Sequence, residues 1–376
     1  MESTATTSAD DQGAGALSIR KVAIIAGAII AFLIGSGFAT GQEILQYFAS
    51  RGYIGVFGTG ALVLVLMTFV CIQFITIGRA QRFERPTDIY RFLCGKVVGT
   101  FFDWFSMVFV FMSFWVMVAG AGAVFAEHYG LSAWIGGLGL AIVVGITGVL
   151  GLNGLVEVIG KIGPIIVAVA LTLGIAAILK HPGGIAKGAE AVGSLDVTQA
   201  SSSWWLAAIS YVGFCMLWLA PFLSALGATT HSRREAVAGA GLGAGLFSIA
   251  CVVVGLGLLA NIDRVVGTQI PMLVLAKDFH PILAAGVSVI ILAGIFTTAV
   301  PLLWTVSSRL FDDGSARFRI ATLVLAAVGT LCGLAVPFEK MVNVVYVING
   351  YVGGILLAVM IARAIWGLAT KRGATA

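Results

Sequence analysis

The sequence predicts an all-α membrane protein of about ten transmembrane helices in a 5+5 inverted repeat, with helices 1 and 6 interrupted at the midplane. The first observation is composition. The chain is 59% hydrophobic and 10% charged, whereas soluble domains are roughly 45–50% apolar and about 25% charged. The second is a series of long apolar windows, and the third is a pair of windows with helix-breaking residues in the middle. We therefore expect a lipid bilayer around the chain and no nucleic acid partner, although the net charge is +5.

Ten apolar windows are long enough to cross the hydrocarbon core, which takes roughly 20 residues at about 1.5 Å per residue. They cover residues 21–48, 53–78, 100–128, 131–152, 155–179, 204–229, 236–260, 282–309, 320–336 and 342–366. An even number of crossings places both termini on the same side of the membrane.

The ten spans divide into two sets of five. We expect the following organisation: a disordered cytoplasmic tail over 1–19, a first five-helix repeat over 20–179, an extracellular loop over 180–203, a second five-helix repeat over 204–366 and a cytoplasmic tail over 367–376. The opening segment lacks the basic start and short apolar core of a secretory signal. Because each half holds an odd number of spans, the second half must insert upside down, so the repeat is inverted.

Three connections are long enough to carry structure. The cytoplasmic segment 79–96 is basic, and its Pro86–Thr87–Asp88 start signal predicts a short helix. Segments 180–203 and 261–281 lie outside the membrane in this scheme. They are either short lids over an access path or plain connectors, and the sequence leaves both open.

The Lys and Arg residues decide the orientation. With a cytoplasmic N-terminus, 16 of the 22 basic residues lie at the inside ends of spans, which is a clear positive-inside bias. The inside set is Arg20, Lys21, Arg79, Arg82, Arg85, Arg91, Lys96, Lys161, Arg233, Arg234, Arg309, Arg317, Arg319, Arg363, Lys371 and Arg372, and the outside set is Arg51, Lys180, Lys187, Arg264, Lys277 and Lys340. Both termini should be cytoplasmic, in the cytoplasmic (inner) membrane of a prokaryote.

Helix breakers occur at corresponding places in the two halves. "GSGFATG" (35–41) falls about half-way along span 1, and span 6 carries Ser210, Tyr211 and Gly213 in its middle, with Pro221 two turns later. Free backbone groups cost several kcal/mol each in hydrocarbon, so a break predicts a cavity lined by protein. Paired breaks of this kind indicate a transporter built from inverted repeats, with its binding site between them.

The motif "GSGFATGQEILQYF" resembles the first-helix signature of the YkvI-type amino acid permeases of the amino acid, polyamine and organocation (APC) transporter superfamily. The likeness extends to the cytoplasmic segment after span 2, to "GKIGPII" in span 5, to "YVGFCMLWLAPFLSALG" in span 6 and to "GIFTTAVPLLWTV" in span 8. It implies the LeuT-like 5+5 fold and symport of an amino acid coupled to an ion gradient.

An amino acid substrate brings a carboxylate, an ammonium and a side chain. A half-helix that restarts near Ala39 would present free N–H groups and the positive end of its dipole to the carboxylate. Freed carbonyls would receive the ammonium, and aromatic rings would border the side-chain pocket, although aromatics in spans often face lipid or only pack. The candidate substrate-binding residues are Ser36, Gly37, Thr40, Gly41, Tyr211, Gly213, Phe214, Trp115 and Trp218.

By resemblance to sodium-coupled members of the fold, the carbonyls of Gly35 and Phe38 and the hydroxyls of Thr297 and Thr298 would bind Na⁺. Such an oxygen set suits a hard cation, although threonine hydroxyls in membrane helices also bond back to a carbonyl one turn earlier. In proton-coupled relatives a lysine of span 5 titrates instead, and Lys161 occupies that region. Lys161 could equally reach the interface. Sodium is the first expectation, and proton coupling stays open.

Gln42 and Glu43 are the candidate coupling or gate residues. An ionisable side chain within a span is expensive and is by default a functional hypothesis. Glu43 could hold a substrate ammonium, take up a coupling proton, which a desolvated carboxyl favours, or pair across an outer gate with Gln42 nearby. The alternative is a carboxylate that only stabilises the start of the restarted helix.

Other function classes fit poorly. The sequence has no HExxH zinc motif, GxSxG serine elbow or P-loop, which argues against an enzyme or an ATP-driven pump. A channel would need a continuous polar pore or a repeated filter. The five cysteines form no CxxC pair, so we expect no cofactor or metal beyond a coupling ion, Na⁺ or H⁺. The solute is most simply a small or apolar amino acid. The direction of transport and the oligomeric state stay open.

Overall fold

The computed structural model describes residues 17–150 and 155–373, with side chains described over 17–150 and 163–366. These residues are helical and contain no strand. Nine of the helices within them are long and apolar enough to cross a membrane. Span 1 is the tenth crossing. It is broken into α1 (Ile19–Leu33), α2 (Ser36–Thr40) and α3 (Gln42–Tyr47), each shorter than a bilayer.

The other nine crossings coincide with the predicted spans. They are the π-helix η2 (Ile54–Thr59) continued by α4 (Gly60–Gln81), then α5 (Asp88–Tyr129), α6 (Ala133–Leu150), α7 (Leu155–Lys180), α9 (Trp204–Ala228), α10 (Arg233–Leu259), α13 (Pro281–Leu310), α14 (Ala316–Gly333) and α15 (Phe338–Gly373). Short helices connect them: η1 (Ala49–Arg51), α8 (Gly184–Ala191), η3 (Val192–Ser194), α11 (Ile262–Val265) and α12 (Pro271–Phe279).

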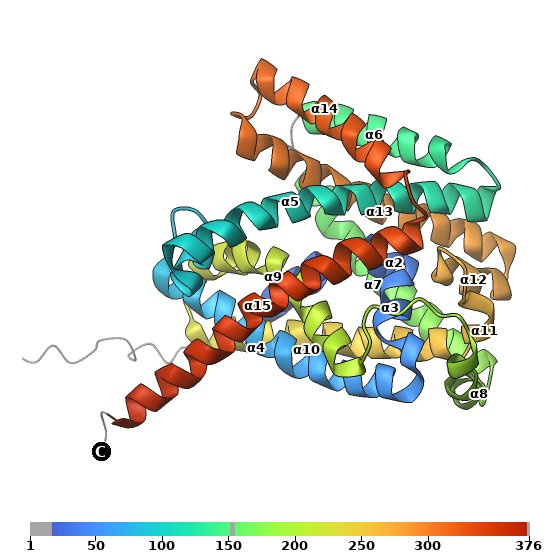
Figure 1. The fold of residues 1–376 in the computed structure, drawn as a ribbon, viewed down its shortest axis with the longest axis horizontal. Helices are drawn as coiled ribbons and strands as arrows, with labels where there is room; N and C mark the ends of the chain where they lie inside the picture. The colour runs from blue at the N-terminus through green and yellow to red at the C-terminus, as the bar shows by residue number, and fades with distance from the viewer. Residues whose placement is uncertain (1–16, 151–154, 374–376) are drawn as a thin grey trace, which may run out of the picture.

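The connections carry the structure that their sequences indicate. The predicted cytoplasmic helix begins at Asp88, directly after Thr87, and continues into span 3 through a kink at Gly95, whose φ of 76° lies in the left-handed region. On the opposite side, α8 lies in the segment after span 5, and α11 and α12 lie between spans 7 and 8. Figure 1 shows α8, α11 and α12 at one end of the bundle, away from the connection between α4 and α5.

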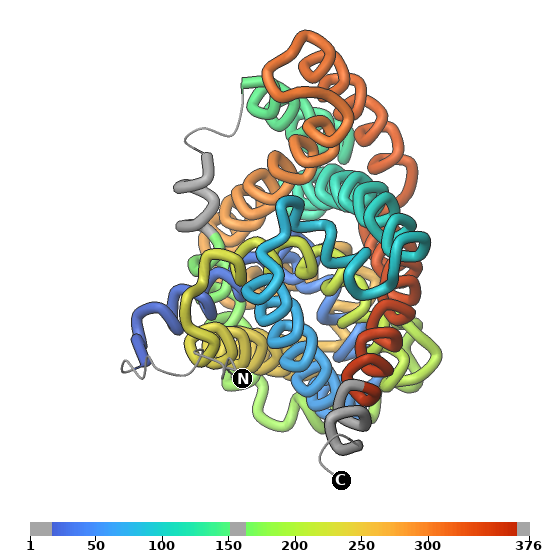
Figure 2. The backbone as a smooth tube through the Cα atoms, turned by 90° about the vertical axis from the view of Figure 1, so that its left-hand side faces the viewer, coloured from blue at the N-terminus to red at the C-terminus, as the bar shows by residue number. Residues whose placement is uncertain are grey.

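Helix packing repeats when each span is replaced by the span five places later in the chain. Span 2 (α4) packs on span 6 (α9), and span 7 (α10) packs on span 1 (α1). Likewise α5 and α13 pack together, and α6 and α14 lie side by side at the edge of the bundle (Figures 1 and 2). This exchange of partners is what two similar five-helix halves produce when they interlock.

The prediction that span 6 is interrupted needs correction, because α9 runs as one helix from Trp204 to Ala228. Gly213 serves close packing: a Cβ there would collide with the Gly350 carbonyl oxygen of α15. Pro221 lacks an N–H and so leaves the carbonyl of Leu217 without its helical donor. The Tyr90 hydroxyl donates to that carbonyl at 2.6 Å. The backbone group that Pro221 frees is thus satisfied by a side chain.

Candidate functional site

Span 1 breaks twice within one helical turn and a half. Ile34 and Gly35 are extended, with ψ of 97° for Ile34 and φ, ψ of −102°, −167° for Gly35. Gly41 is left-handed, with φ of 82°. The helix therefore restarts at Ser36 and again at Gln42, not near Ala39 as the sequence suggested. Every residue of α2 and α3 is buried.

Several backbone groups around the breaks are engaged. The Gly41 amide donates to the Phe38 carbonyl at 3.0 Å, and the Ala39 amide donates to the Gly35 carbonyl at 3.0 Å. The Thr40 hydroxyl donates to the Gly37 carbonyl at 3.1 Å. The Gly41 amide is thus not free for a carboxylate in this conformation. Each carbonyl keeps a second lone pair, so Gly35 and Phe38 retain the capacity expected of ion ligands.

The carboxyl group of Glu43 lies next to this segment, against Gly37. Its side chain is 4% exposed, and the Tyr211 hydroxyl of α9 donates to its Oε1 at 2.6 Å. Its Oε2 lies against Gly37, where an added Cβ would stand 2.5 Å away. Among the described residues Glu43 has no ion pair. The neighbouring Gln42 is also buried, and its Oε1 has no hydrogen-bond partner there.

Aromatic rings from three helices form a wall beside Glu43. Tyr211 and Phe214 of α9 meet Tyr47 of α3 at centroid distances of 5.2 and 5.7 Å. Tyr346 of α15 stacks on Phe214 at 4.7 Å, and Trp218 packs against Phe214 at 6.0 Å. Phe214, Tyr211 and Trp218 were expected from the sequence. Tyr47 and Tyr346 were not.

Span 10 supplies a residue that the sequence argument overlooked. The Cε2 atom of Tyr346 would lie 3.1 Å from a Cβ added at Gly37, so span 10 reaches the break itself. Asn349, one turn later in "VYVING", is also fully buried, but the sequence carries no local signal that this part of span 10 reaches the break. Trp115, by contrast, packs against α14, 3.4 Å from a Cβ added at Gly329, with Phe111 beside it.

The candidate ion ligands of span 8 lie on a helix that packs against α2. The hydroxyls of Thr297 and Thr298 both donate to the Gly294 carbonyl, at 3.1 and 2.9 Å. This is the local bonding that the sequence left as the alternative. Lys161 belongs to α7, but its side chain lies outside the described residues.

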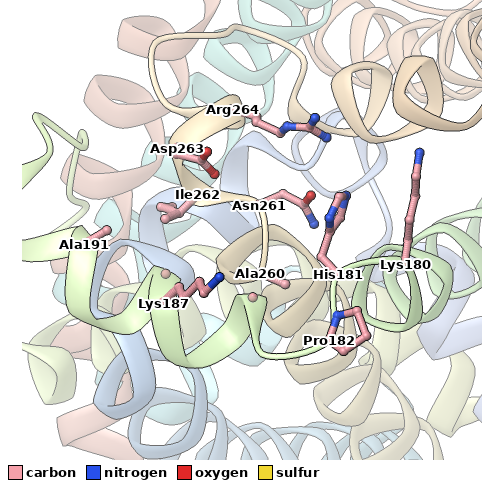
Figure 3. A pocket seen from close by; sticks show the side chains of 12 residues that line it. Lys180, His181, Pro182, Lys187, Ala191, Ala260, Asn261, Ile262, Asp263 and Arg264 are labelled. Carbon is pink, nitrogen blue, oxygen red and sulfur yellow. The ribbon is translucent and has the colours of Figure 1, made fainter.

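The cavity at the break is nearly closed. A cavity of about 10 Å³ lies beside Ala39, lined by apolar side chains of α7, α12 and α13, and it has room for about one water molecule. A larger pocket of about 530 Å³ lies at the α8 end of the bundle, between the start of α8 and α11 (Figure 3). Its walls include Lys187 and Asp263, and it is a feature of the connections, not of the broken span.

One carboxylate joins three segments of the chain beside this pocket. Asp278 of α12 forms ion pairs with Lys180 at 2.9 Å, His181 at 3.0 Å and Arg264 at 2.5 Å. Hydrogen bonds from Lys180, His181 and Arg264 hold the pKa of Asp278 well below its usual range. The cluster joins the end of α7 to α11 and α12.

No protein-family profile matches the chain. A segment of 131 residues, 32% of the chain and 36% of the relative, is 35% identical to the uncharacterized membrane protein YkvI of Bacillus subtilis. The match therefore spans about a third of that relative's length. The uncharacterized protein YyaD of Bacillus subtilis is 23% identical over 284 residues, 75% of the chain and 79% of that protein.

Solved structures share the fold. MhsT in complex with L-phenylalanine superposes with a TM-score of 0.57 at 15% identity, over 92% of the chain and 89% of MhsT. A Na⁺-coupled sialic acid symporter gives 0.56 at 15% identity, over 95% of the chain and 81% of the symporter. The fold is LeuT-like. A manganese transporter of Eremococcus coleocola gives 0.50 at 13% identity, over 93% of the chain and 78% of that transporter. Two of these neighbours are named as a transporter and a symporter, and none is named as an enzyme.

Proposed function

We propose that this protein is a secondary active transporter of a small zwitterion, an amino acid, working by alternating access coupled to an ion gradient. The observation that carries the proposal is the double break of span 1. Its two short helices are wholly buried and face a carboxyl group and an aromatic wall. A break in a transmembrane helix is tolerated only where protein groups or a cavity satisfy the freed N–H and C=O groups. Transporters place their binding sites at such breaks.

The surroundings of the break suit a zwitterion. Tyr211, Phe214 and Tyr346 offer an apolar wall with hydroxyl groups that can pack on a small or apolar side chain. Carbonyls of the unwound segment can accept from an ammonium. Opening of the segment would release the Gly41 amide from Phe38 and make an anion-binding N–H available to the carboxylate.

Two coupling ions fit the residues present. Na⁺ would use the carbonyls of Gly35 and Phe38 with the hydroxyls of Thr297 and Thr298, which would rotate away from Gly294. Protons would use Glu43 or Lys161. We also propose membership of the YkvI-type permeases in the APC superfamily, on the first-helix motif and on the 35% identity to YkvI over 131 residues. We also propose the inner membrane of a prokaryote, with both termini cytoplasmic.

A second candidate is a proton-coupled or uncoupled exchanger or exporter of another small organic solute, which the buried Glu43 favours. A channel is the far alternative, because it would need a continuous polar pore, whereas the cavity of about 10 Å³ beside the break is lined by apolar side chains. Counterflow distinguishes a carrier from a channel, since preloaded substrate accelerates uptake through a carrier and not through a channel.

The test is uptake by the purified protein in liposomes, with a pool of labelled amino acids under an imposed sodium gradient or an imposed proton gradient. Sodium-driven accumulation that Thr298→Ala abolishes supports the transporter and the span 8 ion site together. Accumulation driven by protons alone moves coupling to Glu43 or Lys161. No accumulation and no counterflow in either arm would contradict amino acids as the cargo.

A further inference from the structure

Glu43 is a carboxyl group sealed inside the bundle without a basic partner. It is 4% exposed, and among the described residues its hydrogen bond comes from Tyr211. Glu43 lies in the first turn of α3, where the helix dipole favours a carboxylate. Among the described residues no backbone amide donates to it, so the dipole of a six-residue helix is all that compensates an ionised carboxyl group here.

The elements that pack on α3 are α2, η1, α9, α10 and α15. No side chain of α2 titrates, and the guanidinium of Arg51 on η1 points outward, where it donates to Gln199 at 2.7 Å and to the Ser201 carbonyl. The titratable groups that face Glu43 are Tyr47, Tyr211, Cys215, Cys251 and Tyr346.

All five of these groups are ordinarily neutral at pH 7. An ionised carboxylate here would thus face phenol and thiol groups with no described cation to compensate it. An uncompensated charge inside a membrane protein is expensive. Binding one proton removes the charge and keeps the Tyr211 hydrogen bond, because the second carboxyl oxygen still accepts.

Gly41 forms a hinge between α2 and α3, and movement at this hinge would expose the Glu43 carboxyl group. Glu43 belongs to α3 and Gly37 belongs to α2, and the left-handed Gly41 separates the two helices. The Glu43 Oε2 lies directly against Gly37. A change in the angle at Gly41 would therefore lift the carboxyl away from Gly37 and admit water to it.

We propose that Glu43 is a proton-binding site that couples transport to the proton gradient. The carboxylate takes one proton from water when the hinge opens to one side of the membrane, and an O–H bond forms at a carboxyl oxygen. That bond breaks and the same proton returns to water when the segment opens to the other side. This inference rests on the proposed function and specifies the ion that drives it.

The first measurement needs no substrate. Infrared difference spectra of the purified protein across a pH titration should contain the C=O band of a protonated carboxyl in the wild type. Glu43→Gln should remove that band. Glu190→Gln, the same change at an exposed position of α8, should keep it. A band that is unchanged in Glu43→Gln would overturn the proposal.

A second variant guards against misfolding of the first. Tyr211→Phe removes the hydroxyl that donates to Oε1, and a carboxylate that loses a donor binds its proton more readily. The midpoint of the infrared band should therefore move to higher pH. A midpoint that stays where it is in the wild type would overturn the proposal.

Liposomes then test coupling. An internal pH dye should record proton movement with substrate transport by the wild type and by Glu190→Gln, and this movement should fall at least about tenfold in Glu43→Gln, a loss equivalent to 1.4 kcal/mol. Proton movement that survives in Glu43→Gln would overturn the proposal. If the band behaves as expected but no amino acid is carried, the cargo proposed above is wrong and the proton site stands.

Discussion

At Gly37 the absence of a side chain determines what the neighbouring residues can do. A Cβ there would stand 2.5 Å from Glu43 Oε2, 3.0 Å from Glu43 Cβ and 3.1 Å from the Tyr346 ring. Glycine is thus required by close approach from two sides, one from α3 and one from α15. The same residue joins the broken helix, the buried carboxyl and the aromatic wall, so a small change there reaches all three.

Gly37→Ala should lower amino acid uptake roughly tenfold while membrane expression stays normal. The added Cβ would displace the Glu43 carboxyl group, and a strain of about 1.4 kcal/mol in the transport step slows that step tenfold. Uptake and expression would be measured in parallel with Gly27→Ala. Gly27 is the matched control, since an added Cβ there meets nothing within 4 Å. Equal uptake by both variants would show that Gly37 does not need to be glycine.

The short helix α12 is held at both ends by carboxylates. Glu127, near the end of α5, accepts from the amides of Gln269 and Ile270 just before α12 begins. Asp278, near its end, pairs with three basic residues. Between these ends Met272 approaches Gly41, where an added Cβ would lie 2.9 Å from its Cγ. Helix α12 therefore covers Gly41, which is the position expected of a lid over span 1.

Asp278→Asn should loosen α12 at neutral pH. The lowered pKa of Asp278 means that ionisation stabilises the fold above the unfolded pKa of about 3.9, and this contribution is lost as pH falls through the folded value. Amide exchange in α12 should rise severalfold at pH 7, in line with up to about 1 kcal/mol for a partly exposed ion-pair network.

The difference in melting temperature between wild type and Asp278→Asn should shrink as the pH falls below the unfolded pKa. Asp263→Asn is the control, because Asp263 lies in the same outer segment and has no ion pair among the described residues. The same rise in amide exchange in both variants would mean that the clamp at Asp278 does not hold α12.

The transmembrane helix α9 remains continuous because one side chain compensates for its proline. Tyr90→Phe should leave the Leu217 carbonyl without a donor and destabilise the protein by about 1–3 kcal/mol, the cost of a buried unsatisfied polar group. Pro221→Ala restores a backbone N–H for that carbonyl, so the double variant should lose less stability than Tyr90→Phe alone. Thermal unfolding in detergent measures all three proteins, and strictly additive losses would contradict the compensation.

On the scale of the whole molecule, the sequence predicted the spans better than the contacts between them. Bilayer thickness imposes one length on every crossing, so apolar windows located all ten. The break at Gly41 was predictable because Gly, Ser and Thr cluster there. Gly213 was ambiguous, since a glycine within a span breaks a helix in one setting and admits a neighbour such as Gly350 in another. Tyr346 is far from span 1 in sequence, and nothing local indicates that α15 reaches the break.

The fold alone does not determine which end of the molecule faces the cytoplasm, so this orientation depends on the distribution of basic residues. Either end of two interlocked halves could face the cytoplasm, but in the predicted topology 16 of the 22 basic residues lie on the side of the connection between α4 and α5. Basic residues stay on the cytoplasmic side. The α8 end, with α11 and α12, should therefore face outward (Figure 1).

A cysteine introduced on each side tests this orientation in intact cells. Ser194→Cys lies in exposed η3 and Glu84→Cys lies in the exposed connection after α4. Cys94 and Cys332 are replaced by alanine in both, because these two native cysteines are half-buried and the other three are buried. A membrane-impermeant maleimide should label Ser194→Cys directly and Glu84→Cys only after permeabilisation. The reverse labelling pattern would show that the protein has the opposite orientation, and it would contradict the prediction from the basic residues.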